Sequence, residues 1–129
     1  MTSTSDNLGR IILIENDYGN RILFTDYLEH CGYSVLPLVD GMELLEILEK
    51  VQPSLLMLNL KLSGIDGFSI IETLRRHDTW YSLPILVVSG YTLQADKQKA
   101  YDLGADAYLV KPVLPSDLRL AVEQLLRSR

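Results

Sequence analysis

Short apolar runs alternate along this chain with longer segments in which apolar residues recur at helical spacing. The runs cover residues 11–14, 34–38, 55–58, 85–88 and 108–110. A short continuous apolar run is typical of a strand that is buried on both faces, as in a parallel sheet. The pattern therefore predicts five strands.

The segments between these runs are predicted to be helices. Helical spacing covers residues 18–30, 42–51, 68–76 and 92–103, and a last helix is marked by Leu118, Ala121, Val122 and Leu125. Asp40 is expected to cap the helix at 42–51, because its carboxylate can accept a hydrogen bond from a free backbone N–H. The polar residues 1–9 are expected to form a flexible tail, which leaves residues 10–129 as a single domain.

Strands that alternate with helices predict an α/β domain, with a parallel sheet, helices on both faces and right-handed crossovers. Five such units in 129 residues fit a flavodoxin-like, doubly wound fold with strand order 2-1-3-4-5. In this architecture, binding sites lie at the carboxyl ends of the strands, near the point where the strand order reverses. The residues that directly follow each strand are therefore the candidates for a site.

Composition narrows the possible functions. Twelve Lys and Arg against 17 Asp and Glu give a net charge of −5, which argues against nucleic acid or an anionic membrane surface as partner. Cys31 is the single cysteine, so an intramolecular disulfide and a cysteine-based zinc cluster are excluded. No apolar run approaches the roughly 20 residues of a membrane span, and no export signal is visible, so the cytoplasm is the expected location.

Polar residues suited to binding ions or phosphate groups follow four of the five predicted strands. In chain order they are Glu15, Asn16 and Asp17, then Asn59, then Ser89, then Lys111 with Pro112. Each of them alone is better explained as a helix cap, a turn residue or a solvated lysine than as a site residue. Together, at one edge of the sheet, they predict a single crevice that holds a carboxylate, amides, a hydroxyl and an ammonium group.

The order of these motifs resembles the receiver domain of two-component response regulators. The matching stretches are residues 12–17, 58–60, 64–67, 87–90 and 104–112, of which the last, GADAYLVKP, is the most specific. The resemblance extends from residue 10 to about residue 127. It implies the same flavodoxin-like fold that the alternation of strands and helices predicts.

The resemblance also implies roles for the residues in the crevice. In the family, an Asp at the end of the third strand accepts a phosphoryl group from a histidine kinase, and acidic residues after the first strand help it to hold Mg²⁺. A Ser or Thr and a Lys contact the phosphoryl oxygens, and these roles fall to Ser89 and Lys111. This chain departs from the pattern, because Asn59 stands at the phosphoacceptor position and Asn16 at the second acidic position. Glu15 retains the first acidic position.

These departures imply a degenerate pseudo-receiver, which is not an enzyme and signals by binding. An amide cannot form the acyl phosphate, because its nitrogen lone pair is delocalised and its oxygen carries no full charge. Mg²⁺ usually depends on carboxylates, so its binding is expected to be lost or weak, with Glu15 as the residual ligand and Asp17 next to it. No other cofactor is expected. Lys111 is expected to donate to the amide oxygen of Asn59 and to pair with Glu15.

The fourth helix, fifth strand and fifth helix form the output surface in this family. Here that surface is expected to include Lys97, Tyr101, Tyr108, Pro112, Arg119, Val122 and Glu123. Tyr108 matches the family's aromatic switch position, although Tyr101 and Tyr108 are equally well explained as ordinary half-buried aromatics. A histidine kinase, an output domain or a second copy of the chain is the expected partner. Ala107 replaces the Asp that makes salt bridges across the dimer in one large subfamily, which argues against that dimer.

Two other functions are compatible with the same fold. One is an active phosphoreceiver that uses Asp17, Asp66 or Ser63 as acceptor, although none of these matches the acceptor position. The other is a small flavodoxin-like enzyme or FMN binder. It is disfavoured because no phosphate-cradling loop rich in Ser, Thr or Gly follows the first strand.

Overall fold

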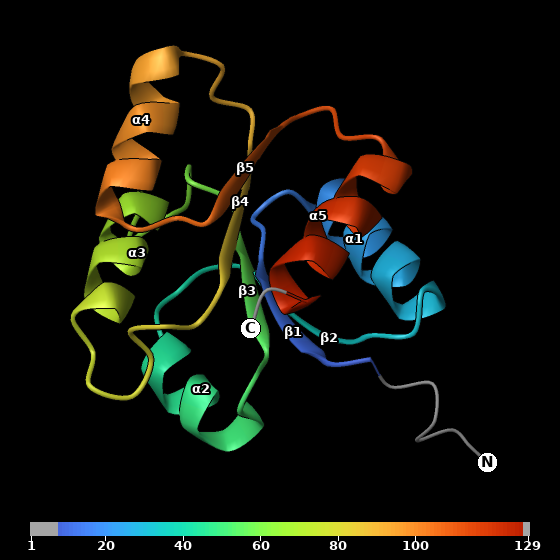
Figure 1. The fold of residues 1–129 in the computed structure, drawn as a ribbon, viewed down its shortest axis with the longest axis horizontal. Coiled ribbons are helices and arrows are strands. Elements are labelled where there is room, and N and C mark those ends of the chain that lie inside the picture. The colour runs from blue at the N-terminus through green and yellow to red at the C-terminus, as the bar shows by residue number, and fades with distance from the viewer. Residues whose placement is uncertain (1–7, 128–129) are drawn as a thin grey trace.

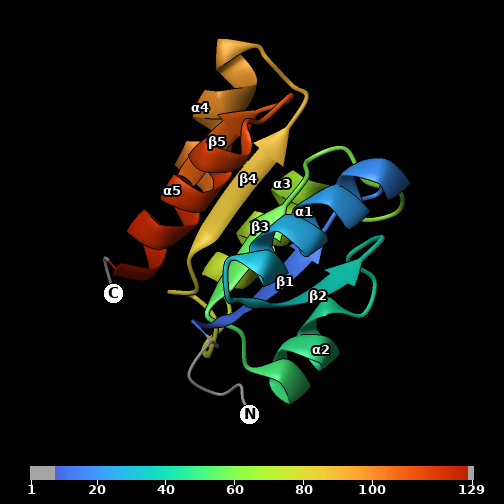
Figure 2. The same ribbon diagram turned by 90° about the vertical axis from the view of Figure 1, so that its right-hand side faces the viewer.

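A computed structural model describes residues 8–127 of the chain. Its sheet has five parallel strands in the order β2-β1-β3-β4-β5, as the sequence predicts (Figure 1). In chain order the strands are β1 (Arg10–Ile14), β2 (Ser34–Leu38), β3 (Leu55–Leu58), β4 (Ile85–Ser89) and β5 (Ala107–Val110). The carboxyl ends of all five strands lie at the same edge of the sheet (Figure 2).

The helices cover both faces of this sheet. They are α1 (Tyr18–His30), α2 (Leu44–Val51), α3 (Gly67–Arg75), α4 (Gln94–Leu103) and α5 (Pro115–Arg127). Figure 1 shows α1 and α5 on one face and α2, α3 and α4 on the other. The flavodoxin-like, doubly wound prediction is therefore confirmed. No helix in the described part of the chain has the length and apolar character needed to cross a membrane.

The continuous apolar runs of β1, β3 and β4 are explained by burial on both faces of the sheet, whereas the edge strand β2 is largely exposed. Ile12 and Leu56 pack toward α2, α3 and α4, whereas the neighbouring residues Ile11 and Leu55 pack toward α1 and α5. Side chains alternate between the two faces of a strand, so both sets of positions have to be apolar. The strands therefore form a rigid platform under the residues that follow them.

Several predicted elements begin or end one or two residues away from the observed bounds, and α2 is the clearest case. Helix α2 begins at Leu44, and Asp40 does not cap it; the Oδ1 of Asp40 accepts a hydrogen bond from the N–H of Met42 (3.1 Å) in the turn before the helix. Residues 1–7 of the predicted tail lie outside the described residues. The backbones of Leu8 and Gly9 are hydrogen-bonded to Gly32 and Ser34, at 2.8 and 2.9 Å.

Arg75, at the end of α3, joins segments at the edge of the sheet opposite the strand ends that carry the candidate site. Its guanidinium donates to the carbonyl oxygens of Gly104 (2.9 Å), Tyr81 (3.1 Å) and Leu83 (2.8 Å). It also forms an ion pair with Asp106 (2.9 Å). One side chain thus ties the entrance of β4 and the turn before β5 to α3.

Candidate functional site

The predicted strand-end residues come together in one crevice of about 360 Å³. The residues that line it and were predicted from the sequence are Glu15, Asn16, Asp17, Asn59, Ser89 and Lys111. Lys61, Gly90 and Tyr91 also line the crevice and were not predicted. Each of these three lies within two residues of a predicted one, so their proximity in the sequence was the available signal.

A buried ion pair lies at the base of the crevice. The Nζ of Lys111 is 2.7 Å from Oε1 of Glu15, whose side chain is only 1% exposed. The Oε2 of Glu15 accepts a hydrogen bond from the N–H of Asp17 (2.9 Å). The pairing expected between Lys111 and Glu15 is therefore present. The hydrogen bond expected from Lys111 to the Asn59 amide does not occur among the described residues, because the ammonium is directed at Glu15.

The amide of Asn59 points its nitrogen at a ring of oxygen atoms. Its Nδ2 lies 2.8 Å from Oδ1 of Asn16, 3.3 Å from the carbonyl oxygen of Lys61 and 3.4 Å from Oε2 of Glu15. If the amide of Asn16 is turned over, its own nitrogen lies 3.1 Å from the Lys61 carbonyl and 3.3 Å from Glu15 Oε2. In both orientations, amide N–H groups face the oxygens of Glu15 and Lys61. A neutral donor group therefore occupies the centre of this oxygen cluster.

The loop after β1 is held by two residues of α1. The Oδ2 of Asp17 accepts a hydrogen bond from the N–H of Asn20 (2.8 Å), which makes Asp17 the cap of α1. Arg21 donates to the carbonyl oxygens of Glu15 (3.0 Å) and Asn16 (3.4 Å). Sequence reasoning did not identify Arg21, because the side chain acts on backbone carbonyls that only the folded loop turns toward it.

The opposite wall of the crevice connects to Tyr108. Ser89 is fully buried, and its Oγ accepts a hydrogen bond from the N–H of Tyr91 (3.1 Å). The hydroxyl of Tyr108 donates to the carbonyl oxygen of the same Tyr91 (2.9 Å), and the Tyr108 side chain is buried. Burial raises the pKa of the Tyr108 phenol above its ordinary value of 10.0. The loop after β4 thus lies between the crevice and Tyr108.

The expected output surface is only partly exposed. Tyr101 is 43% exposed, and its ring lies 6.5 Å from that of Tyr108. Arg119 forms an exposed ion pair with Glu123 (3.0 Å). Val122 was wrongly included in this surface, because it is fully buried in the core between α5 and the sheet. Tyr108 is also buried, so the side chains that a partner could contact here include Tyr101 and Arg119 but not Tyr108.

Two of the alternative acceptors lie outside the crevice. Asp66 caps α3, where its Oδ1 accepts a hydrogen bond from the N–H of Ser69 (2.9 Å), and neither Asp66 nor Ser63 lines the crevice.

Gly67, which follows Asp66, lies very close to the backbone that follows β3. A Cβ at this position would lie 2.6 Å from the Cα of Leu60 and 2.7 Å from the carbonyl oxygen of Asn59. The absence of a side chain at Gly67 therefore lets α3 begin directly against the strand end that carries Asn59.

A family model for the response regulator receiver domain matches residues 11–123. The chain belongs to this family. Over 118 residues the receiver domain is 36% identical to the DNA-binding dual master transcriptional regulator RpaA of Synechocystis sp., covering 92% of this chain and 49% of RpaA. It is 27% identical to sporulation initiation phosphotransferase F of Bacillus subtilis, covering 91% of this chain and 93% of that protein. The chain thus spans about half the length of the regulator RpaA.

Solved structures agree with this assignment. A protein described as a response regulator from Chloroflexus aurantiacus superposes with a TM-score of 0.88 at 28% identity, over 92% of this chain and 98% of that one. The chemotaxis protein CheY4 of Vibrio cholerae has a TM-score of 0.83 at 23% identity, over 90% and 97% of the two chains, and supports the fold alone. The relatives are signalling regulators of the receiver family.

Proposed function

We propose that this receiver domain signals by binding a protein partner, without accepting a phosphoryl group. The observation that carries the proposal is Asn59 at the end of β3, at the centre of the crevice. Formation of an acyl phosphate needs a carboxylate oxygen as nucleophile. The amide of Asn59 has no such oxygen, and its nitrogen is directed at neighbouring oxygens as a hydrogen-bond donor.

The donor set in the crevice fits Mg²⁺ poorly. Mg²⁺ binding relies on carboxylate oxygens in near-ideal octahedral geometry. Both carboxylate oxygens of Glu15 already have partners, and Asp17 caps α1. No cluster of three or more His, Cys, Asp or Glu residues suited to a metal occurs among residues 8–127. An amide N–H of Asn59, or of Asn16 if its amide is turned over, already faces Oε2 of Glu15.

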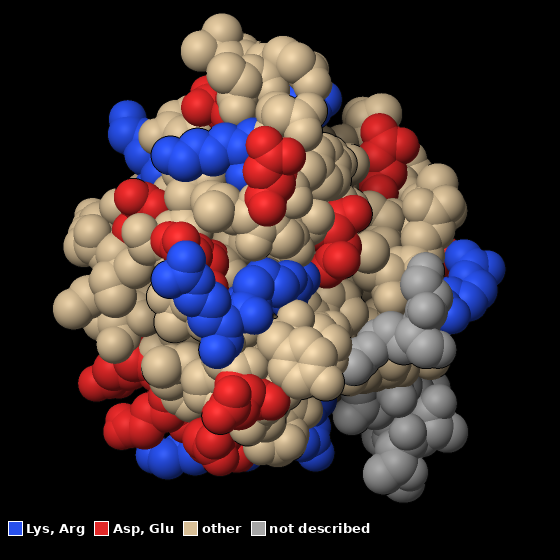
Figure 3. Space-filling model, turned by 60° about the vertical axis from the view of Figure 1, so that its left-hand side comes forward, with Lys and Arg blue, Asp and Glu red and all other residues tan. Residues whose placement is uncertain are grey.

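Membership of the receiver family and the exposed side chains on α4, β5 and α5 both support a protein partner. Receiver domains interact with histidine kinases and output domains, and a second copy of the chain is a third candidate. The surface formed by α4, β5 and α5 offers Tyr101 and the ion-paired Arg119 to such a partner. Figure 3, which turns the left side of Figure 1 forward, shows charges of both signs interspersed on that side rather than one basic patch. On the face shown in Figure 3, this distribution disfavours direct binding of nucleic acid.

Asp17 would be the remaining acceptor of an active phosphoreceiver. It lines the crevice, but its carboxylate holds the first turn of α1. Phosphoryl transfer to Asp17 would break that cap and would start from a position three residues beyond the end of β1. These costs make it the weaker proposal.

Incubation with acetyl phosphate and Mg²⁺, followed by intact-mass measurement, tests the proposal. The unmodified mass is expected at every time point, and the double variant Asn16→Asp with Asn59→Asp supplies the positive control for the phosphoryl donor. An added phosphoryl group in the parent chain would contradict the proposal. Mapping that group to Asp17, Asp66 or Ser63 would establish the alternative function instead.

A further inference from the structure

A second cavity, of about 260 Å³, opens between α2 and α3 and shares no lining residue with the strand-end crevice. We propose that this cavity is a binding site for a small, uncharged aromatic molecule. The site goes beyond the proposed signalling function and does not depend on it.

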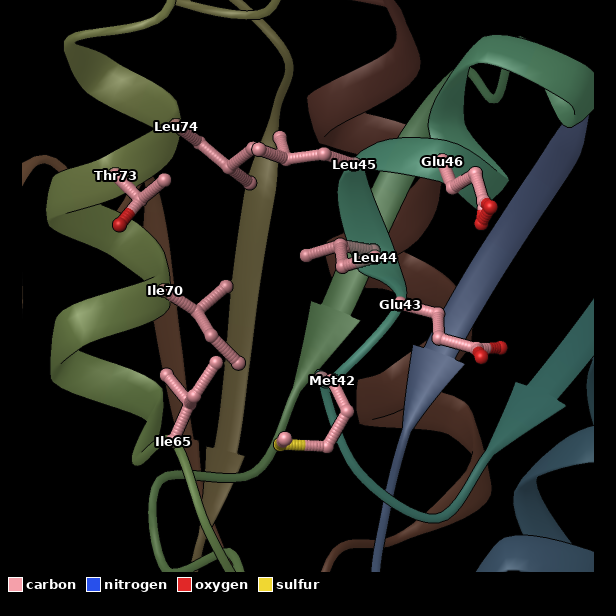
Figure 4. Close-up of a pocket in the computed structure, with 10 residues that line it drawn as sticks. Met42, Glu43, Leu44, Leu45, Glu46, Ile65, Ile70, Thr73 and Leu74 are labelled. Atoms are coloured by element: carbon pink, nitrogen blue, oxygen red, sulfur yellow. The ribbon is translucent and has the colours of Figure 1, made fainter.

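The walls of the cavity are apolar side chains that face one another. Figure 4 shows Leu44 and Leu45 of α2 pointing toward α3, with Ile70 and Leu74 of α3 on the opposite side. Leu44, Ile70 and Leu74 are buried and form the deeper part of the site. Helices α2 and α3 make much less direct contact with each other than α3 and α4 do. The cavity thus occupies a place where two neighbouring helices would otherwise pack together.

The opening of the cavity exposes three large apolar side chains. Met42 is 61% exposed, Leu45 42% and Ile65 39%, and they come from the loop before α2, from α2 itself and from the loop before α3. Large apolar residues from separate segments that converge on one opening are a mark of a binding site. A ligand here would cover all three at once.

Two glycines allow close approach at one end of the cavity. A Cβ on Gly41 would lie 2.5 Å from Cδ1 of Ile70, and a Cβ on Gly64 would lie 3.1 Å from Sδ of Met42. The absence of both side chains lets the loops before α2 and α3 approach Ile70 and Met42. The cavity is therefore bordered at this end by closely spaced residues.

The charged and apolar residues that line the cavity indicate what charge a ligand can carry. Glu43 and Glu46 belong to the lining, but Figure 4 shows their carboxylates pointing away from α3. Neither forms an ion pair with another residue in the described range. They would repel an anion, yet they do not point inward to pair with a cation. A highly polar ligand would lose its hydration without gaining partners from the leucine and isoleucine walls. An uncharged, largely apolar molecule fits this surface best.

The size of the cavity and Met42 favour an aromatic ligand. An apolar cavity of about 150 Å³ is enough to bind benzene. The larger volume here accommodates a fused two-ring system of the size of indole or naphthalene. The thioether of Met42 makes favourable contacts with aromatic rings, and its flexible side chain can close over a bound ring.

Titration of the isotope-labelled domain with indole, followed by amide-resolved NMR spectra, tests this site. We expect saturable shifts confined to residues 41–46 and 65–74. Indole-3-acetate, a matched anion, should bind about tenfold more weakly or worse because of the unpaired carboxylates. Leu45→Trp should fill the cavity and weaken indole binding by at least about tenfold, whereas Leu23→Trp, at a similarly exposed position on α1, should leave it unchanged.

The proposal is overturned by any of four results with folded protein. These are no saturable shift with indole, shifts centred on another surface, equal binding of indole-3-acetate, or no effect of Leu45→Trp. If Leu45→Trp proves unfolded, Met42→Lys replaces it, because Met42 is mostly exposed and a charge there should also block an apolar ligand. Binding of a partner helix in place of a small molecule would appear as failure of indole to shift these residues.

Discussion

Replacement of Lys111 by Met should test how strongly the crevice depends on its buried ion pair. The substitution keeps the aliphatic length of the side chain and removes the ammonium group that lies 2.7 Å from Glu15. Glu15 is 1% exposed and would lose its only cationic partner among the described residues, while the side chain of Lys111 is 18% exposed. Loss of one partner of a buried pair costs about 3–5 kcal/mol, and the partial exposure of Lys111 favours the lower end of that range.

We therefore expect Lys111→Met to lower the free energy of unfolding by about 3 kcal/mol. For a chain of this size, that corresponds to a melting temperature lower by roughly 10 °C. Urea unfolding followed by circular dichroism measures the free energy, and a thermal scan checks the shift. The double variant Glu15→Gln with Lys111→Met should recover much of the loss, because no unpaired charge is left in the crevice.

Arg119→Met is the matched control for this experiment. It also removes the cation of an ion pair, but Arg119 and Glu123 are 56% and 37% exposed. An exposed pair of this kind contributes about 0–1 kcal/mol, so the control should change stability little. If Lys111→Met costs no more than Arg119→Met, Glu15 does not need its partner and the account of the crevice is wrong.

Three further predictions concern other parts of the structure. The double variant Asn16→Asp with Asn59→Asp should be less stable than the parent in EDTA, regain stability with Mg²⁺, and take up a phosphoryl group from acetyl phosphate, whereas Asn59→Asp alone should do less. A folded double variant that shows neither response would mean that the crevice has diverged beyond these two positions. Arg75→Met should lower the free energy of unfolding by about 2–3 kcal/mol in urea, against about 0.5 kcal/mol or less for the exposed Arg76→Met; equal effects would contradict the role given to Arg75. Gly67→Ala should cost about 1–3 kcal/mol in the same assay, because its Cβ would meet the backbone of the strand-end loop, and a neutral effect would refute the close approach.

The fold could be predicted from the sequence because its strongest signal is burial on both faces of a sheet. A continuous apolar run gave β3 with its observed bounds, and the helical spacing gave α1 from Tyr18 to His30. The bounds of β2 were also predicted, although this edge strand is largely exposed. The start of α2 could not be predicted in the same way. Asp40 is an equally good candidate for a cap or for a turn, and only the path of the loop decides that its carboxylate bonds to Met42.

The composition of the crevice was predictable, but its internal bonding was not. Parallel topology brings the strand ends together, so Glu15, Asn59 and Lys111 had to be neighbours. Whether Lys111 bonds to Glu15 or to the amide of Asn59 depends on side-chain directions that the sequence does not encode in any local pattern. The same reason explains Arg21, whose long side chain reaches carbonyl groups that are turned toward it only after the loop has folded.

The amide at Asn59 also has a consequence for the timing of a signal. An acyl phosphate hydrolyses spontaneously, so the active state of a phosphorylated domain has a limited lifetime. A domain whose central residue forms no such bond has no active state limited in this way. The duration of its signal is set by how fast the partner dissociates and by how much of each protein is present. Under the proposed function, such a signal would end when the partner dissociates or when the amount of either protein falls, rather than by dephosphorylation.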